Sequence, residues 1–115
     1  MTARLATDFW VAAYRARLAA AGIPCYLTRK GDPTAGAVLV KLATLDGKAR
    51  LYGRAYGLDG ARVWAVLAEG DEPAVDAAAA RQRGYDPDLW LIEIEDRQGR
   101  TLLEDAGLED AGPGA

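Results

Sequence analysis

The chain has 115 residues, 50% of them hydrophobic, with 14 basic and 17 acidic residues and a net charge of −3 at pH 7. It contains no His and a single Cys, Cys25. These counts exclude an intramolecular disulfide, a Cys-based zinc site, His-ligated metals and His-dependent catalytic triads. We also expect no cofactor and no bound metal. Four of the acidic residues lie at 104–110, so the rest of the chain is close to neutral and has no strong attraction to nucleic acid or to an anionic membrane.

A helix followed by a short strand is predicted at the N-terminal end. Four apolar residues follow the helical spacing within residues 7–21 and define one buried stripe: Val11, Tyr14, Leu18 and Ala21. Gly22 and Pro24 then end the helix. The strand covers residues 23–28, and Pro24 near its start favours an edge position in a sheet, because Pro cannot donate a ladder hydrogen bond.

Three further strands are predicted over residues 37–44, 49–57 and 62–68. Asp46-Gly47 lies between the first two strands, and Asp59-Gly60 lies between the second and the third. Asp-Gly pairs favour tight hairpin turns because both residues tolerate positive φ. The middle of the chain is therefore expected to fold as an antiparallel meander.

A second helix and a last strand complete the domain. The helix covers residues 71–83: Pro73 and the acidic residues of the first turn favour its start, and Gly84 favours its end. Its inner face is predicted to consist of small side chains, Val75, Ala78 and Ala79. A strand over residues 89–95 follows.

The order α-β-β-β-β-α-β predicts a single α+β domain over residues 1–103. We expect a mostly antiparallel sheet of about five strands, with both helices packed on one face. Residues 104–115 form an acidic tail rich in Gly and Ala, which we expect to be frayed or disordered.

The sequence predicts a cytoplasmic protein. No run of about 18 apolar residues is present, so no transmembrane helix is expected. Asp8 and Arg15 interrupt the N-terminal apolar stretch, so no signal peptide is expected. The lone Cys25 is consistent with a reducing compartment.

A surface of Arg and Tyr side chains is predicted on the strand over residues 49–57. The alternation along this strand places four of them on one face of the sheet: Arg50, Tyr52, Arg54 and Tyr56. Arg62 and Trp64 extend the pattern on the next strand. Such a surface suits stacking and cation–π contacts with a base, a ring or a peptide. The simpler interpretation, which we favour, is a half-solvated face whose long side chains cover apolar surface.

Two charged loops precede apolar strands and are candidates for an anion-binding site. The first contains Arg29, Lys30 and Asp32, and the second contains Arg81, Arg83 and Asp86. An anion site requires the two loops to be neighbours in the fold. The simpler interpretation is a pair of turns, because both loops contain an Asp-Pro pair and neither has the glycine spacing and the following helix of a phosphate loop.

Glu93 and Glu95 share one face of the last predicted strand. Paired carboxylates can hold Mg²⁺ or supply an acid and a base. The interpretation that we favour is a cross-strand ion pair with Lys41, Arg50 or Arg54.

Three blocks of the sequence together resemble one protein family. They are Phe-Trp-Val at 9–11, Arg-Lys-Gly-Asp-Pro-Thr-Ala-Gly-Ala-Val-Leu-Val at 29–40, and Arg-Gln-Arg-Gly-Tyr-Asp-Pro-Asp-Leu-Trp-Leu-Ile-Glu at 81–93. The resemblance is to the alphaproteobacterial domain-of-unknown-function family numbered 1491, and it extends to about residue 104. It implies a compact bacterial protein without an assigned activity, and it supplies no catalytic residues.

We therefore expect a non-enzymatic interaction or regulatory module, whose partner is another protein or a small anionic ligand. Its binding surface would be the Arg50–Tyr56 face with residues 29–32 at the rim, because Tyr and Arg are favoured at interfaces. One alternative is a sensor that binds an anionic ligand at the two charged loops. Another is a metal-dependent nuclease, since the order of elements is similar to that of restriction-endonuclease-like enzymes. For that chemistry the chain has Asp32 and Lys41 but lacks the required Glu-x-Lys pair.

Overall fold

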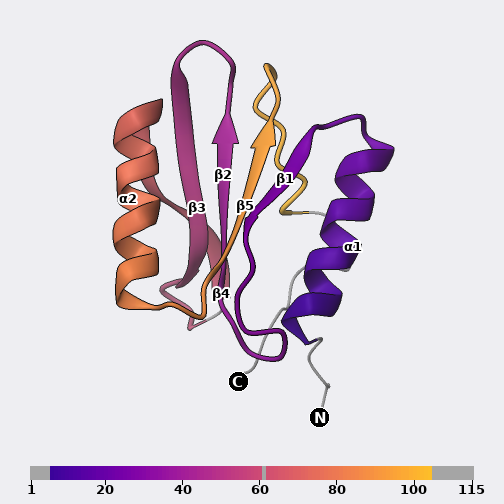
Figure 1. Ribbon diagram of the computed structural model, residues 1–115, viewed down its shortest axis with the longest axis vertical. Helices are drawn as coiled ribbons and strands as arrows, with labels where there is room; N and C mark the ends of the chain where they lie inside the picture. Colours follow the sequence, from indigo (N-terminus) through magenta and orange to yellow (C-terminus); the bar gives the residue numbers. More distant parts are fainter. Residues whose placement is uncertain (1–5, 61, 105–115) are drawn as a thin grey trace.

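Residues 6–60 and 62–104 are described by the structure, a computed structural model of the chain (Figure 1). The elements are, in chain order, α1 (Thr7–Ala20), β1 (Cys25–Arg29), β2 (Val38–Ala43), β3 (Lys48–Tyr56), β4 (Arg62–Asp71), α2 (Glu72–Tyr85) and β5 (Trp90–Glu95). This order confirms the predicted succession of elements and the α+β class. The predicted acidic tail lies, except for Glu104, outside the described residues, and its disorder stays a prediction.

The described strands form one five-stranded sheet in the order β1-β5-β2-β3-β4. The pairs β1–β5, β2–β3 and β3–β4 are antiparallel, whereas β2 and β5 are parallel. The prediction of a mostly antiparallel sheet is thus confirmed, although the parallel pair β2–β5 makes the sheet mixed. This parallel pair forms after the chain has crossed from β4 through α2 to β5. β1 lies at an edge of the sheet, as Pro24 at its start predicts.

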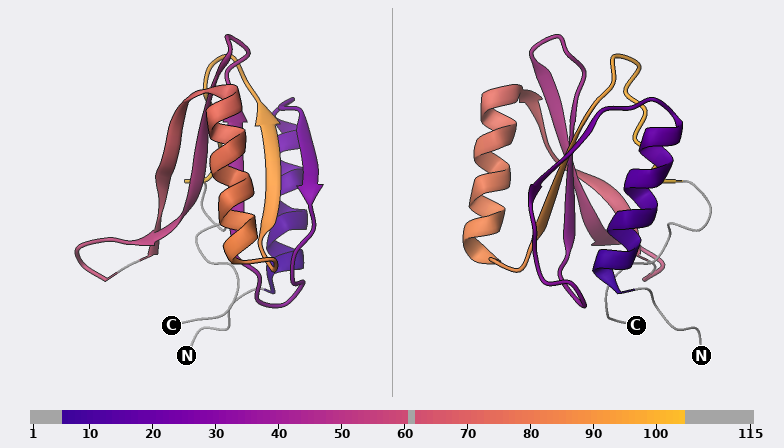
Figure 2. Two further views of the ribbon diagram at one scale, coloured as in Figure 1. Left: turned by 60° about the vertical axis from the view of Figure 1, so that its left-hand side comes forward. Right: turned by 45° about the vertical axis from the view of Figure 1, so that its right-hand side comes forward.

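The two helices pack on opposite faces of the sheet, so the prediction that both cover one face is wrong (Figure 2). Val40 of β2 belongs to the core under α1, while its neighbour Leu39 belongs to the core under α2. Successive side chains of a strand point to opposite faces, and all residues of β2 are buried. A strand that is buried on both sides needs a cover on both sides, and the result is three layers with the sheet in the middle.

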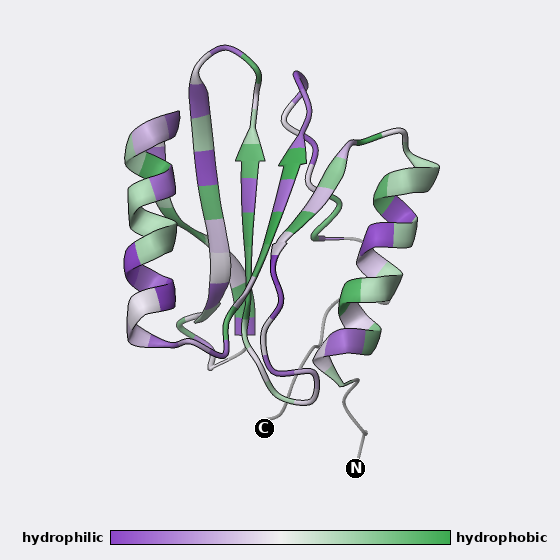
Figure 3. Ribbon diagram, viewed as in Figure 1, coloured by the Kyte–Doolittle hydropathy of each residue, from purple (hydrophilic) through white to green (hydrophobic). Residues whose placement is uncertain are grey.

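The core on the α1 side is built from large side chains. Three residues of the predicted helical stripe are buried, Val11, Tyr14 and Leu18, whereas Ala21 is exposed because α1 ends one residue earlier. The rings of Trp10 and Tyr14 stack with their centroids 5.0 Å apart. They belong to a cluster with apolar residues of β2 and β5, the green segments in the middle of Figure 3. The Tyr14 hydroxyl donates to the Thr101 carbonyl at 2.7 Å and so ties the segment after β5 to α1.

The core on the α2 side is made of smaller side chains. Val75 and Ala79 are buried and Ala78 is partly buried, which confirms the predicted inner face of the second helix. Gly53 of β3 faces the same side, where a Cβ would come 2.6 Å from Leu67 Cδ1. Small residues therefore let the elements of this layer approach one another closely.

A junction between two loops closes the lower end of the sheet in Figure 1. The backbone N–H of Asp32 donates to the Asp88 carbonyl at 3.0 Å, and the indole N–H of Trp90 donates to the Asp32 carbonyl at 2.8 Å. Gly31 permits this approach, because a Cβ there would come 2.1 Å from the Asp88 carbonyl oxygen. We call these contacts the loop junction. It joins two of the three sequence blocks noted above.

Candidate functional site

The predicted site residues divide between the two faces of the sheet. Four of them form what we call the Arg/Tyr surface of β3: Arg50, Tyr52, Arg54 and Tyr56. This surface is on the α1 side, where Tyr52 packs against the core under α1. Arg29 and Arg83 instead line a hollow on the α2 side. The structure therefore does not place the first charged loop at the rim of the Arg/Tyr surface.

Both Arg side chains of the Arg/Tyr surface contact residues of the neighbouring strand β4. Arg50 forms an ion pair with Glu69, with Nε 3.1 Å from Oε2. The guanidinium of Arg54 lies over the ring of Trp64, 4.6 Å from its centroid. That ring in turn lies 5.5 Å from the ring of Trp10 in α1. The surface is thus held in shape by contacts that run from α1 to β4.

Large apolar side chains are exposed along the β3–β4 hairpin. Five of them are at least 43% exposed: Tyr56, Leu58, Val63, Val66 and Leu67. The left view of Figure 2 shows the turn of this hairpin projecting away from both helices. β4 is also an edge strand, so its outer backbone groups are open to a partner.

A hollow of about 410 Å³ lies between α2 and the strands β1 and β5. Its lining includes six polar or large side chains: Thr28, Arg29, Asp76, Arg83, Leu91 and Glu93. The structure thus brings Arg29 of the first predicted charged loop and Arg83 of the second to the same hollow. Lys30 and Arg81 are exposed and do not line this hollow.

The acidic residues of the two charged loops stabilise their own turns. Asp32 Oδ2 accepts the N–H of Ala35 at 2.7 Å, and Asp86 Oδ1 accepts the N–H of Asp88 at 3.1 Å. These are the turn contacts that an Asp side chain typically makes. Neither Asp32 nor Asp86 lines the hollow.

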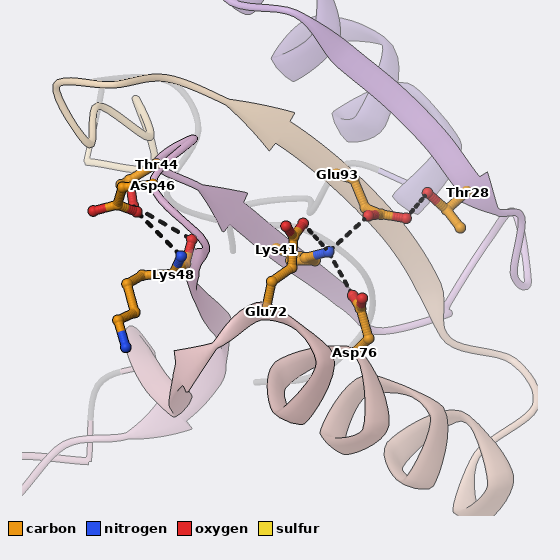
Figure 4. A network of polar contacts seen from close by, with 8 residues as sticks. All are labelled: Thr28, Lys41, Thr44, Asp46, Lys48, Glu72, Asp76 and Glu93. Atoms are coloured by element: carbon orange, nitrogen blue, oxygen red, sulfur yellow. Dashed lines mark hydrogen bonds and ion pairs between the residues drawn. The ribbon is translucent and has the colours of Figure 1, made fainter.

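An ion cluster around the buried Lys41 of β2 lies beside the hollow (Figure 4). The Lys41 side chain is 4% exposed, and its Nζ lies 2.5 Å from Asp76 Oδ1 and 2.7 Å from Glu72 Oε2. Glu93 completes the cluster with Oε1 at 3.2 Å from Nζ, and its Oε2 accepts the Thr28 hydroxyl at 2.5 Å. Burial alone would lower the pKa of Lys41, but the hydrogen bonds to the three carboxylates outweigh it and raise the pKa above its ordinary value.

The sequence predicts only part of this cluster. Lys41 and Glu93 are direct neighbours in the parallel pairing of β2 with β5. Glu93 therefore forms the cross-strand ion pair with Lys41 that the sequence favours. Glu72 and Asp76 are absent from the predicted site. A signal for them is present, because they lie four residues apart, which places both on one face of α2.

Asp32 and Lys41, the two residues that the nuclease alternative would use, are both engaged in other contacts. Asp32 is held in its turn, and Lys41 is held in the ion cluster. Over residues 6–60 and 62–104, no group of three or more His, Cys, Asp or Glu residues is placed to hold a metal ion. Neither helix of these segments combines the length and the apolar character that a membrane crossing requires.

Comparisons with known proteins point to one family. The family model described as "Protein of unknown function (DUF1491)" matches residues 5–104. A crystal structure of a DUF1491 family protein from Caulobacter crescentus CB15 is 44% identical, with a TM-score of 0.79, and the match covers 93% of this chain and 98% of that chain. An NMR structure of a DUF1491 family protein from the same organism is 42% identical, with a TM-score of 0.78 and coverage of 97% and 100%. The solution structure of protein Atu0922 from A. tumefaciens is 30% identical, with a TM-score of 0.74 and coverage of 98% and 100%. No curated protein matches the chain.

Proposed function

The chain belongs to the DUF1491 family, and we propose that it is a non-enzymatic interaction module that binds another protein through its β3–β4 hairpin. The observation that carries this proposal is the set of large apolar side chains exposed along the hairpin, whose turn projects away from both helices. Large apolar side chains that stay exposed to water in one region of a protein typically mark an interaction site. The Arg/Tyr surface on the same hairpin adds residue types that are enriched at interfaces.

The contacts within the hairpin support binding because they fix its shape in advance. Arg54 lies on Trp64, and Trp64 packs toward Trp10 of the core. Side chains that are already held in place lose less conformational freedom when a partner binds. Tyr56, which is 71% exposed, is the natural anchor, since a large aromatic side chain supplies much of the contact area in an interface.

The ion cluster around Lys41 supports a binding role over a catalytic one. A Lys that acts as a base or a nucleophile needs a lowered pKa, so that it is neutral near pH 7. Burial acts in that direction at Lys41, but the three carboxylates prevail and raise its pKa. The ammonium group therefore stays charged, and the chain has no His to take its place.

We place this interaction in the cytoplasm. Cys25 is a free, partly buried thiol in β1. Burial raises the pKa of this thiol, although Arg15 acts against it, so the protonated form is favoured. Free thiols of this kind persist in a reducing compartment.

The test compares the wild type with a hairpin variant and a matched control. The double variant Tyr56→Ser/Val66→Ser removes two exposed apolar side chains from the hairpin, whereas Tyr85→Ser removes an exposed Tyr from the end of α2. Each immobilised protein is incubated with extract of the source cells, and the captured proteins are quantified by mass spectrometry after cross-linking.

We expect the wild type and the Tyr85 variant to capture the same proteins, and the hairpin variant to lose them at an unchanged melting temperature. A hairpin variant that captures the same proteins as the wild type would show that the hairpin is not the binding surface, and the proposal would fail.

A further inference from the structure

The hollow beside α2 is separate from the Arg/Tyr surface and lies on the other side of the sheet. α2 forms one wall and β1 the other, with Leu91 and Glu93 of β5 between them. Its volume of about 410 Å³ falls within the range of small-molecule sites, roughly 300–1,000 Å³. The hollow is therefore large enough for a small metabolite.

Opposite charges line the two ends of this hollow. Asp76 and Arg83 both belong to α2, and the helical rise over the seven residues that separate them is about 10 Å. On the strands, Arg29 pairs with Leu91, while Glu93 lies two residues further along β5, about 7 Å away. Arg29 and Arg83 mark a positive end near the loop junction, and Asp76 and Glu93 mark a negative end at the ion cluster.

The charged groups at both ends have binding capacity left. Within residues 6–60 and 62–104, neither Arg29 nor Arg83 forms an ion pair with a carboxylate. The Nη2 of Arg83 donates to the Pro87 carbonyl at 3.3 Å, which orients the guanidinium. At the other end Asp76 binds Lys41 through Oδ1, and its side chain is 54% exposed, so Oδ2 is open to a further donor.

We propose that the hollow binds a small zwitterion. The carboxylate of the ligand lies between Arg29 and Arg83, where bidentate hydrogen bonds from guanidinium groups suit it. The ammonium group lies against Asp76 and Glu93. Leu91 covers the methylene groups between the two charges. The ligands with this chemistry are ω-amino acids and short peptides, whose two charges are several bonds apart.

The balance of charge favours a zwitterion over a simple ion. Two guanidinium groups line one end of the hollow. At the other end three carboxylates share the single ammonium group of Lys41, so this end stays negative. An anion without an amine would meet the carboxylates at one end, and a cation without a carboxylate would meet the guanidinium groups at the other. A ligand that carries both charges satisfies both ends.

The test is a titration of the ¹⁵N-labelled protein with 6-aminohexanoate, followed by NMR at low ionic strength because salt screens exposed charges. Hexanoate and hexylamine serve as controls, since each keeps one of the two charges. We expect 6-aminohexanoate to bind about fivefold or more tightly than either control, and to shift the amide signals of residues that line the hollow. Absence of binding at concentrations up to about 20 mM would overturn the proposal, as would equal affinity for the three compounds.

Two variants on the same helix separate a specific site from a general charge effect. Arg83→Gln removes a guanidinium from the hollow, whereas Arg81→Gln removes an exposed one that does not line it. We expect Arg83→Gln to weaken 6-aminohexanoate binding about tenfold, and Arg81→Gln to change it by less than about twofold, with both proteins folded by thermal unfolding. Equal losses in the two variants would mean that the ligand responds only to net charge, and the proposed site would be wrong.

Discussion

Replacing Lys41 by Met should destabilise the protein, because the substitution leaves three carboxylates facing one another without their cation. The Nζ atom of Lys41 lies 2.5–3.2 Å from one oxygen of each carboxylate, and the side chain is 4% exposed. Met is unbranched and apolar and fills irregular space. The substitution therefore removes the charge while it keeps most of the buried volume.

The size of the effect follows from the exposure of the carboxylates. Removing one partner of a fully buried ion pair costs about 3–5 kcal/mol. Here the side chains of Glu72, Asp76 and Glu93 are 40%, 54% and 30% exposed, so water replaces part of the lost interaction. We expect a loss of about 2–3 kcal/mol in the free energy of unfolding. With about 4 °C per kcal/mol for a domain of this length, the melting temperature should fall by about 8–12 °C.

The assay is thermal unfolding followed by circular dichroism, with Lys48→Met as the matched control. Lys48 also forms an ion pair, with Nζ 2.5 Å from Asp71 Oδ1, but the two side chains are 61% and 72% exposed. Exposed ion pairs contribute little to stability, so this variant should melt close to the wild type. Adding Asp76→Asn to Lys41→Met should recover part of the loss, because it removes one of the repelling charges. Equal melting temperatures for the Lys41 and Lys48 variants would refute the reasoning.

The same ion cluster gives a pH dependence that extends the test. The pKa of Lys41 in the folded state is raised above the ordinary value of 10.5. Its contribution to stability is therefore fully present below that pH and is lost as the pH rises through the folded-state pKa. The difference in unfolding free energy between the wild type and Lys41→Met, measured in urea, should stay constant from pH 7 to about 10 and shrink above that range. A difference that grows with pH would contradict the assignment.

Two further predictions concern the loop junction and the core. Gly31→Ala brings a Cβ to within 2.1 Å of the Asp88 carbonyl oxygen and should lower the melting temperature by several degrees, whereas Gly84→Ala, whose Cβ meets nothing within 4 Å, should leave it unchanged or slightly higher. Tyr14→Phe removes the hydrogen bond to the buried Thr101 carbonyl and should cost about 1–2 kcal/mol in urea unfolding. An unchanged free energy in that variant would show that another donor satisfies the carbonyl.

Most elements of the fold can be predicted because each carries a local signal. The two Asp-Gly pairs mark the hairpin turns, and Gly47 and Gly60 have φ values of 86° and 82°. The face that each helix covers depends on packing between distant segments, so local patterns do not determine it. One indirect signal is present in β2, whose sequence Val-Leu-Val-Lys-Leu-Ala lacks the alternation of a half-exposed strand. A largely apolar run of this kind, interrupted here only by Lys41, is typical of a strand that is covered on both faces.

The candidate sites are harder to predict because they join residues that are far apart in the sequence. Arg29 and Arg83 stand out as charged residues next to turns, but the hollow that they share depends on how β1, β5 and α2 are arranged. The spacing of four residues between Glu72 and Asp76 places both on one face of α2, but this spacing does not indicate that they meet Lys41 of β2. The sequence predicts Arg54 as a group for cation–π contacts with a ligand. In the structure its partner is instead Trp64 of the next strand, because the antiparallel register places the two residues directly opposite each other.

The loop junction shows how structural and functional residues are related in this fold. Trp90 donates to the Asp32 carbonyl, and this contact holds the segment that follows β1 against the segment that follows α2. Arg29 is the last residue of β1, and Arg83 lies in the last turn of α2. The positions of both guanidinium groups therefore depend on a contact that neither Arg makes. The sequence blocks at 29–40 and 81–93 supply the residues of the loop junction. Arg29 and Arg83, which we assign to ligand binding in the hollow, lie at or near the start of these blocks.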